Sequence, residues 1–219
     1  MDLEFFLNER TRFVLYFYRT AARGFSEIVR AIENEEEPYV PPYSEDGEPP
    51  FLVEWMEAQT GLASLGYSAL SMLSASLKLY LEEWTVRIEN PQQKFSRKHR
   101  RGWFHAYRQI LQDVGVVLES CPADLELIEQ TVLARNLVQH PDDLTQMEVH
   151  HSEKDLKRYP NPVFLSKQEA KMLEESSDLF SPWMTPKVSI DEAKLQEAVR
   201  HIESLCSWLE AQYWSARNA

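Results

Sequence analysis

The chain is poor in cysteine, has no long apolar run and lacks an excess of positive charge, and each shortage excludes a class of protein. Its two cysteines, Cys121 and Cys206, are too few and too far apart for a disulfide framework, so we expect packing thiols in a reducing compartment. With 35 acidic and 23 basic residues the net charge is −12, which argues against a protein that coats nucleic acid over its whole surface. The uncharged stretch from Gly61 to Leu77 is interrupted by serines and is shorter than the roughly 20 apolar residues of a membrane span.

Several familiar motifs are also absent. The chain has no glycine-rich phosphate loop, no serine nucleophile elbow and no dinucleotide fingerprint, so we expect no cofactor. No basic segment precedes an apolar run at the N-terminus, where Glu9 and Arg10 follow closely, so we expect a cytoplasmic protein.

Apolar residues recur at helical spacing along most of the chain, and no segment alternates apolar and polar residues for long enough to predict a sheet. The predicted fold class is therefore all-α, with one helical bundle over residues 1–219. An acidic loop with five prolines is expected over 37–50 and a loop-rich insertion with one short helix over 141–187. The five main helices are predicted at Leu3–Glu35, Phe51–Glu89, Ser96–Ser120, Ala123–Gln139 and from about Ser189 onward.

Two details of this prediction concern single helices. Ser166 with Glu169, and Ser189 with Glu192, have the spacing of capping boxes, so we expect each pair to begin a helix. For the first helix we expect one apolar face to be buried, consisting of Phe6, Phe13, Phe17, Ala21, Ile28 and Ile32.

The most informative segment is the end of the fourth predicted helix. Its apolar stripe of Leu125, Ile128 and Val132 continues at helical spacing onto polar residues, which are Arg135, Asn136, Gln139 and His140. Polar groups on such a face either meet buried partners or line a cleft, because burying them unpaired costs about 1 to 3 kcal/mol each. Pro141 predicts that the helix ends just before His140. Arginine suits phosphate oxygens and histidine transfers protons near neutral pH, so this pair suits metal-free phosphoryl chemistry.

The segment Arg135-Asn136-Leu137-Val138-Gln139-His140 resembles the signature of the HEPN superfamily (higher eukaryotes and prokaryotes nucleotide-binding), in which an arginine and a polar residue precede a histidine. The resemblance is confined to this motif in a helical context. It implies a metal-independent endoribonuclease of toxin or phage-defence type, a homodimer with one cleft formed by two motifs, and an antitoxin or other regulatory partner. By the same resemblance His140 transfers protons, Arg135 stabilises charge on phosphorus and Asn136 orients one of these groups.

A basic segment follows the second predicted helix. Its cations are interleaved with aromatic residues, a pattern typical of single-strand RNA binding, and the candidate contacts are Lys94, Arg97, Lys98, Arg100, Arg101, Trp103 and Arg108. The alternative is a solvated basic face, with Trp103, Phe104 and Tyr107 in the core.

Three other interpretations are open at this stage. Arg135 could pair with a carboxylate while His140 caps its helix near the C-terminal dipole. The chain could be a non-catalytic interaction module that binds a protein through the 37–50 loop and the 141–187 insertion. His150 and His151 could bind a metal with nearby glutamates, but adjacent histidines rarely have the spacing of zinc sites, so we expect no metal.

Overall fold

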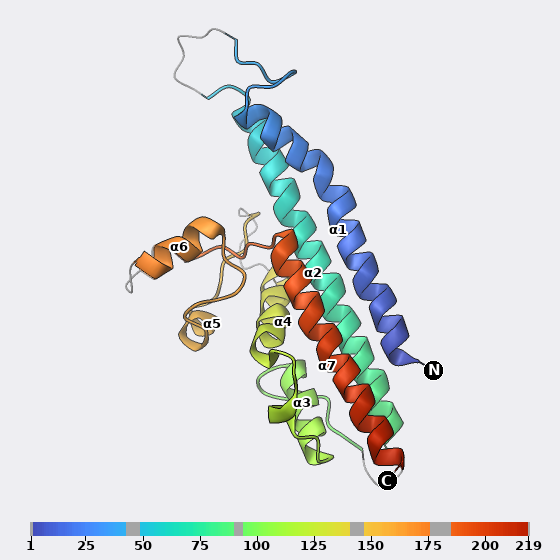
Figure 1. The fold of residues 1–219 in the computed structure, drawn as a ribbon. Helices are drawn as coiled ribbons and strands as arrows, with labels where there is room; N and C mark the ends of the chain where they lie inside the picture. The colour runs from blue at the N-terminus through green and yellow to red at the C-terminus, as the bar shows by residue number, and fades with distance from the viewer. Residues whose placement is uncertain (1, 43–48, 90–93, 141–146, 176–184, 219) are drawn as a thin grey trace.

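The computed structural model describes residues 2–42, 49–89, 94–140, 147–175 and 185–218. Three long helices lie side by side in it: α1 (Leu3–Glu33), α2 (Leu52–Ile88) and α7 (Glu192–Asn218). α1 and α2 form an antiparallel hairpin whose upper part extends beyond the start of α7 (Figure 1). No strand is assigned in the described ranges, which confirms the predicted all-α helical bundle.

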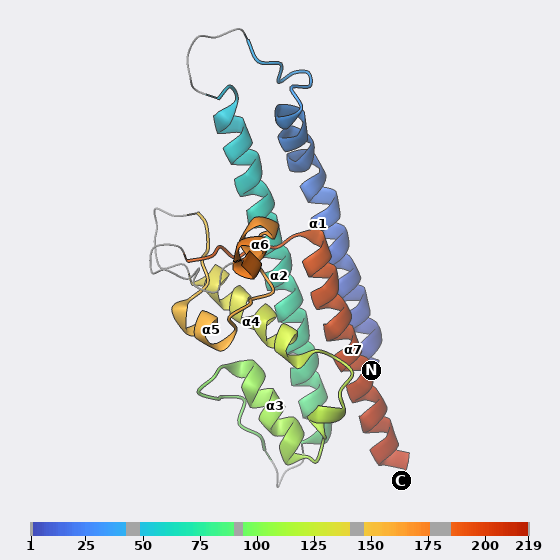
Figure 2. The same cartoon turned by 60° about the vertical axis from the view of Figure 1, so that its left-hand side comes forward.

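The shorter helices lie on the side of α2 and α7 away from α1. Figure 2 shows α4 (Leu125–Gln139) crossing in front of α2, with α3 (Trp103–Asp113) below it. A 3-10 turn, η1 (Leu118–Ser120), connects the two, and α5 (Glu153–Arg158) and α6 (Lys167–Glu175) lie beside α4. The prediction of one short helix in the insertion was therefore incomplete, since Ser152 caps α5 as well.

The core lies where α2, α4 and α7 meet. Aliphatic side chains of these three helices are buried there, and their burial is the main stabilising contribution to the bundle. The most fully buried of them include Leu70, Leu73, Leu77, Ile128, Leu195, Ile202 and Leu209. Cys206 is buried among them, while Cys121 is half-buried beyond η1, and both are free thiols. None of the helices in the described ranges combines the length and apolar composition that crossing a bilayer needs.

The predicted buried face of α1 was wrong. Phe6 and Phe13 are 53% and 54% exposed. The face that packs on α2 and α7 instead consists of Leu3, Leu7, Thr11, Val14, Tyr18 and Ala22. Thr11 makes this stripe hard to recognise in the sequence, because it is a polar residue in the middle of an apolar pattern. It is buried in the structure because its hydroxyl can donate to the Asn8 carbonyl or the Glu203 carboxylate.

The bounds of α3 were also wrong. The helix begins only at Trp103 and ends at Asp113, because Gly102 and Gly115 have φ angles of 101° and 85°, outside the helical region. Described residues 94–101 therefore form a non-helical segment before α3. In contrast, α4 ends at Gln139 with His140 as its C-cap, as predicted.

The insertion is held closed at its base. His150 and Lys187 form an antiparallel bridge, and the Val188 amide donates to the Val149 carbonyl at 2.7 Å. The capping box at Ser166 and Glu169 is confirmed, since each residue's side chain accepts from the other's amide. The second predicted box was wrong: Asp191 accepts from the Lys194 amide at the start of α7, while Glu192 pairs with Arg19.

Candidate functional site at the end of α4

Arg135, Asn136 and His140 lie in the last turns of α4 and at its C-cap. Arg135 and Asn136 are half-buried and His140 is exposed. The Arg135 Nη1 donates to the Asn136 Oδ1 at 3.0 Å, and the His140 amide donates to the Asn136 carbonyl at 3.1 Å. Asn136 is thus joined to both other members of the motif.

One polar atom of the Arg135 side chain is buried. Its Nε is buried without a hydrogen-bond partner, and no ion pair to a carboxylate is found for this side chain in the described part of the chain. An unpaired buried donor costs about 1 to 3 kcal/mol, so the Nε of Arg135 is an unsatisfied donor within the site. α4 remains helical to Gln139, so the helix end does not unwind to bring Arg135 and His140 together.

A cluster of charged residues, which the sequence did not predict, surrounds Glu129 in the middle of α4. The Glu129 side chain is only 4% exposed and accepts from His105 Nε2 at 2.8 Å. Arg108 of α3 approaches Oε2 of Glu129 at 3.4 Å, and Arg158 at the end of α5 contacts Oε1, the oxygen that His105 also contacts. We call Glu129, His105, Arg108 and Arg158 the Glu129 cluster; it joins α3, α4 and α5.

Burial controls the protonation of this cluster. It lowers the pKa of His105, and the nearby Arg158 and Arg108 lower it further against the opposing effect of Glu129. Burial likewise raises the pKa of Tyr159 to about 12, with the Glu129 charge adding to the rise. His105 is therefore neutral near pH 7, so the ion pairs of the Glu129 cluster set two arginines against one carboxylate.

Asn136 and His140 lie on the same face of α4 as Glu129, whereas Arg135, six residues after Glu129, lies about 120° further round the helix. Asn136 and His140 follow Glu129 by seven and eleven residues, spacings that return to nearly the same side of a helix. With a rise of about 1.5 Å per residue, His140 lies about 16 Å further along the axis than Glu129. One sequence signal for Glu129 existed, because it follows Leu125 by four residues and precedes Val132 by three on the apolar stripe.

The predicted RNA contacts divide into two groups. Lys94, Lys98, Arg100 and Arg101 are exposed on the segment before α3. The other three make contacts within the protein. Arg97 pairs with Glu89 at 3.1 Å, Arg108 belongs to the Glu129 cluster, and Trp103 packs edge-on against Phe104 and Tyr107. Phe104 and Tyr107 are in the core, as the alternative interpretation required.

The two adjacent histidines of the insertion, His150 and His151, have separate partners within the protein. His151 is buried, with Nε2 3.0 Å from the Phe164 carbonyl, and His150 forms the bridge to Lys187. Glu148 pairs with Lys187 instead of a histidine. Within the described ranges no group of three or more histidine, cysteine, aspartate or glutamate side chains is arranged to hold a metal ion.

Two cavities lie elsewhere. One, with room for about one water molecule, separates α4 from the insertion and is lined by Gln130, Leu137, His151 and Tyr159 among others. A larger cavity of about 390 Å³ lies at the far tip, between the end of α1 and the start of α2, and is lined by Ile32, Tyr39 and Trp55 among others. Neither includes Arg135, Asn136 or His140. Asp142 and the rest of 141–146 lie outside the described residues.

Comparison with known proteins adds no relative. No protein-family model, no curated protein and no solved structure matches this chain. The arrangement of side chains at the end of α4 and the resemblance of its motif are the remaining indications of function.

Proposed function

We propose that this chain is a HEPN-like, metal-independent endoribonuclease of toxin or phage-defence type that cleaves single-stranded RNA. The observation that carries the proposal is the arrangement at the end of α4. A half-buried Arg135 with an unsatisfied Nε is oriented by Asn136, and His140 is exposed at the C-cap, one turn after Asn136. A fixed guanidinium and an accessible imidazole are the groups that cleavage of a phosphodiester without metal requires.

In the proposed reaction the RNA 2′-hydroxyl attacks the adjacent phosphorus and the bond from phosphorus to the 5′-oxygen breaks. The products are a 2′,3′-cyclic phosphate and a 5′-hydroxyl, so the proton lost by the 2′-oxygen is balanced by one gained by the leaving oxygen. His140 takes part in this proton transfer. Arg135 stabilises the negative charge that develops on the phosphoryl oxygens, with Asn136 fixing its orientation.

The surroundings of the motif support a path for the RNA. The arginines of the Glu129 cluster lie on the face of α4 that carries Asn136 and His140, and Lys94, Lys98, Arg100 and Arg101 lie on the segment that leads into α3. These cations are local exceptions in a chain of net charge −12, so they would concentrate RNA on this side of the molecule.

The test is cleavage of end-labelled single-stranded RNA by the purified protein in EDTA. We expect His140→Ala and Arg135→Ala each to reduce the rate by about 100-fold or more, the usual contribution of a general acid or base. His150→Ala is the matched control, since it removes a half-buried imidazole outside α4, and it should leave the rate unchanged. Circular dichroism checks that each variant folds. Absence of cleavage by the wild type, or equal cleavage by all variants, would refute the nuclease.

A second candidate is a non-catalytic helical module that binds RNA or protein. It is favoured by the internal pairing of Arg97 and Arg108 and by a set of aromatic side chains exposed on α1. RNA binding without cleavage, weakening as salt rises, would support the RNA-binding form of this candidate. Absence of salt-dependent RNA binding would leave the protein-binding form.

A further inference from the structure

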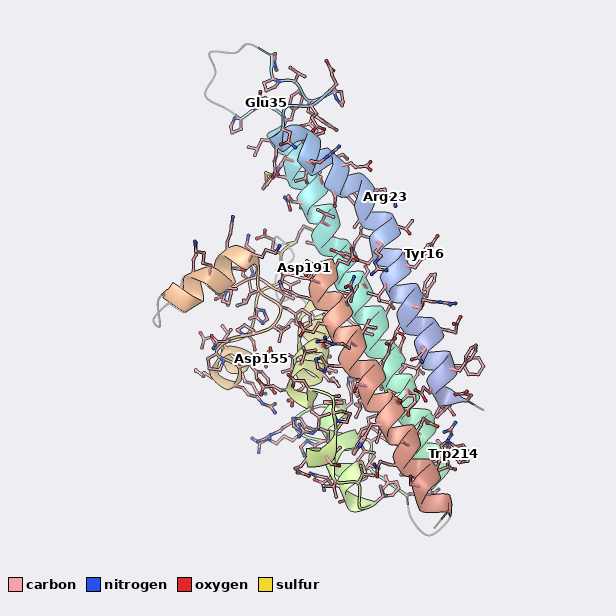
Figure 3. The ribbon with its side chains drawn as sticks, in the orientation of Figure 1. Tyr16, Arg23, Glu35, Asp155, Asp191 and Trp214 are labelled. Atoms are coloured by element: carbon pink, nitrogen blue, oxygen red, sulfur yellow. The ribbon has the colours of Figure 1, made fainter. Side chains whose placement is uncertain are left out.

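The outer face of α1 carries large aromatic side chains that the described protein does not cover. Phe5, Phe6, Phe13 and Tyr16 are 54%, 53%, 54% and 62% exposed. Figure 3 shows Tyr16 and Arg23 projecting from α1 away from the other helices. The aromatic rings contact one another, Phe5 with Phe6 and Phe13 with Tyr16. Monomeric proteins rarely expose contiguous apolar surface of this kind without a binding role.

The spacing on this face is that of a helix which packs against another helix. Its residues follow one another in alternating steps of three and four, the pattern of a coiled-coil seam. We call them the outer seam of α1: Phe6, Glu9, Phe13, Tyr16, Thr20 and Arg23. The opposite side of α1, which includes Leu7 and Val14, is the face used by α2 and α7. α1 therefore has a second face with large aromatic residues, which nothing in the described ranges covers.

We propose that the outer seam binds the outer seam of a second copy of this chain, with the two α1 helices antiparallel and Tyr16 near the two-fold axis. In such a pair, residues equally distant from Tyr16 face each other. Glu9 and Arg23 each lie seven residues from Tyr16, so each Glu9, which also pairs with Arg12 of its own helix at 2.6 Å, faces Arg23 of the other copy, twice per dimer. A parallel pair would instead place like charges opposite one another.

The charge of α1 permits this approach. The chain as a whole has a net charge of −12, so most surfaces of two copies repel each other. α1 differs, because its 31 residues contain five arginines and four glutamates. Arginine and aromatic residues are also the types enriched in protein interfaces.

The exposed aromatic rings supply about half of the area of a standard interface. Each aromatic side chain buries about 150 to 250 Å² when fully covered, so four half-exposed rings offer about 400 Å² per copy. A standard interface buries roughly 800 Å² per partner. The rest of this area can come from the side chains of Glu9, Arg12 and Arg23 and from the adjoining part of α2. Leu79, 46% exposed, belongs to that part of α2, since it lies about one turn from Ser76, which accepts a hydrogen bond from Arg10 of α1.

This inference does not depend on the proposed nuclease. α2 and α7 separate α1 from α4, so the dimer leaves both α4 ends on its outer sides (Figure 1). It does not form the shared cleft that the HEPN resemblance implies. RNA cleavage and pairing through α1 can therefore succeed or fail separately.

The test is the mass of the full chain in solution, measured by light scattering after gel filtration from about 1 to about 100 μM. We expect twice the mass of the chain for the wild type, and the mass of one chain for the double variant Phe13→Glu with Tyr16→Glu. The matched control is Val53→Glu, which adds charge at a 66% exposed position on α2 and should remain dimeric. A monomeric wild type, or a double variant that still dimerises, would overturn the proposal.

Charge reversal tests the antiparallel arrangement. Arg23→Glu should weaken the dimer at least about tenfold, since it then faces Glu9 of the other copy, and adding Glu9→Arg in the same chain should restore it. A second readout is Tyr16→Cys, which should form an intermolecular disulfide under mild oxidation while the unmodified chain, with Cys121 and Cys206, does not. Failure of the double reversal to restore dimerisation, together with absence of the cross-link, would exclude pairing about Tyr16.

Discussion

Glu129 is the residue that joins the most separate parts of this protein. Its carboxylate lies among His105 and Arg108 of α3 and Arg158 of α5, with its side chain almost completely buried. A buried carboxylate with several cationic partners is costly to remove, because the partners are left desolvated and unpaired. Glu129 is therefore expected to be essential for the attachment of α3 and α5 to α4.

We expect Glu129→Ala to lower the free energy of unfolding by about 3 to 5 kcal/mol, the usual cost of breaking a buried ion pair. The matched control is Glu197→Ala, which removes the partner of Arg200 in a surface pair with side chains 47% and 70% exposed. That change should cost less than about 1 kcal/mol. Urea unfolding followed by circular dichroism measures both. Similar costs for the two variants would show that the Glu129 cluster contributes no more than a surface pair.

At the scale of the elements, Gly66 of α2 lies against the backbone just before the start of α7. A Cβ added at Gly66 would lie 2.9 Å from both the Cβ and the carbonyl oxygen of Ile190. The carbonyl oxygen belongs to the backbone just before α7, so it cannot rotate away as a side chain can. The absence of a side chain at Gly66 therefore allows α2 to pack this closely against Ile190.

We expect Gly66→Ala to destabilise the protein by about 1 to 3 kcal/mol, the usual cost of overpacking, despite the better helix propensity of alanine. Gly24→Ala provides the comparison, since Gly24 lies within α1 and an added Cβ meets nothing within 4 Å. There the propensity gain acts alone and should stabilise by about 0.5 to 1 kcal/mol. Thermal unfolding measures the stability of both variants. If both changes raise the stability, or both lower it, the close contact at Gly66 does not have the expected effect.

The helices differ in how well the sequence predicted them. α4 was placed within two residues, because Asp124 caps its start and Pro141 limits its end. α3 was extended by seven residues at each end, because apolar spacing continues through the glycines that take positive φ. In α1 the sequence contains two apolar stripes, and periodicity alone cannot decide which of them packs on α2 and which lies outside.

At the scale of the whole molecule, the candidate site combines a local part and a tertiary part. Arg135, Asn136 and His140 could be found in the sequence because they adjoin one another on α4. The Glu129 cluster could not, because His105 and Arg158 are distant in sequence and only folding of the insertion onto α4 brings them together. Sequence spacing can place residues on one helix face, whereas the neighbours of that face depend on the complete fold.

The fold also buries histidines in a way that affects its stability as a whole. His151 is buried within the insertion, with Nε2 3.0 Å from the Phe164 carbonyl. Burial lowers the pKa of His151, and that carbonyl, Asp155 and Glu169 oppose the change. His105 has a lowered pKa for the same main reason. In the unfolded chain both regain the ordinary histidine pKa of about 6.5. Below that pH the unfolded state therefore binds more protons than the folded state.

The stability contributed by the neutral histidines is thus complete above about pH 6.5 and is lost as the pH falls toward their lowered folded-state pKa values. We expect the free energy of unfolding to decrease between about pH 7.5 and 5.5, by at most about 1.4 kcal/mol per pH unit for each histidine. Urea titrations across this range measure the slope at pH values where most carboxylates remain ionised. In His151→Gln, whose amide can still donate to the Phe164 carbonyl, the slope should become smaller. If the slope of this variant equals that of the wild type, the burial of His151 does not contribute to the acid sensitivity of the fold.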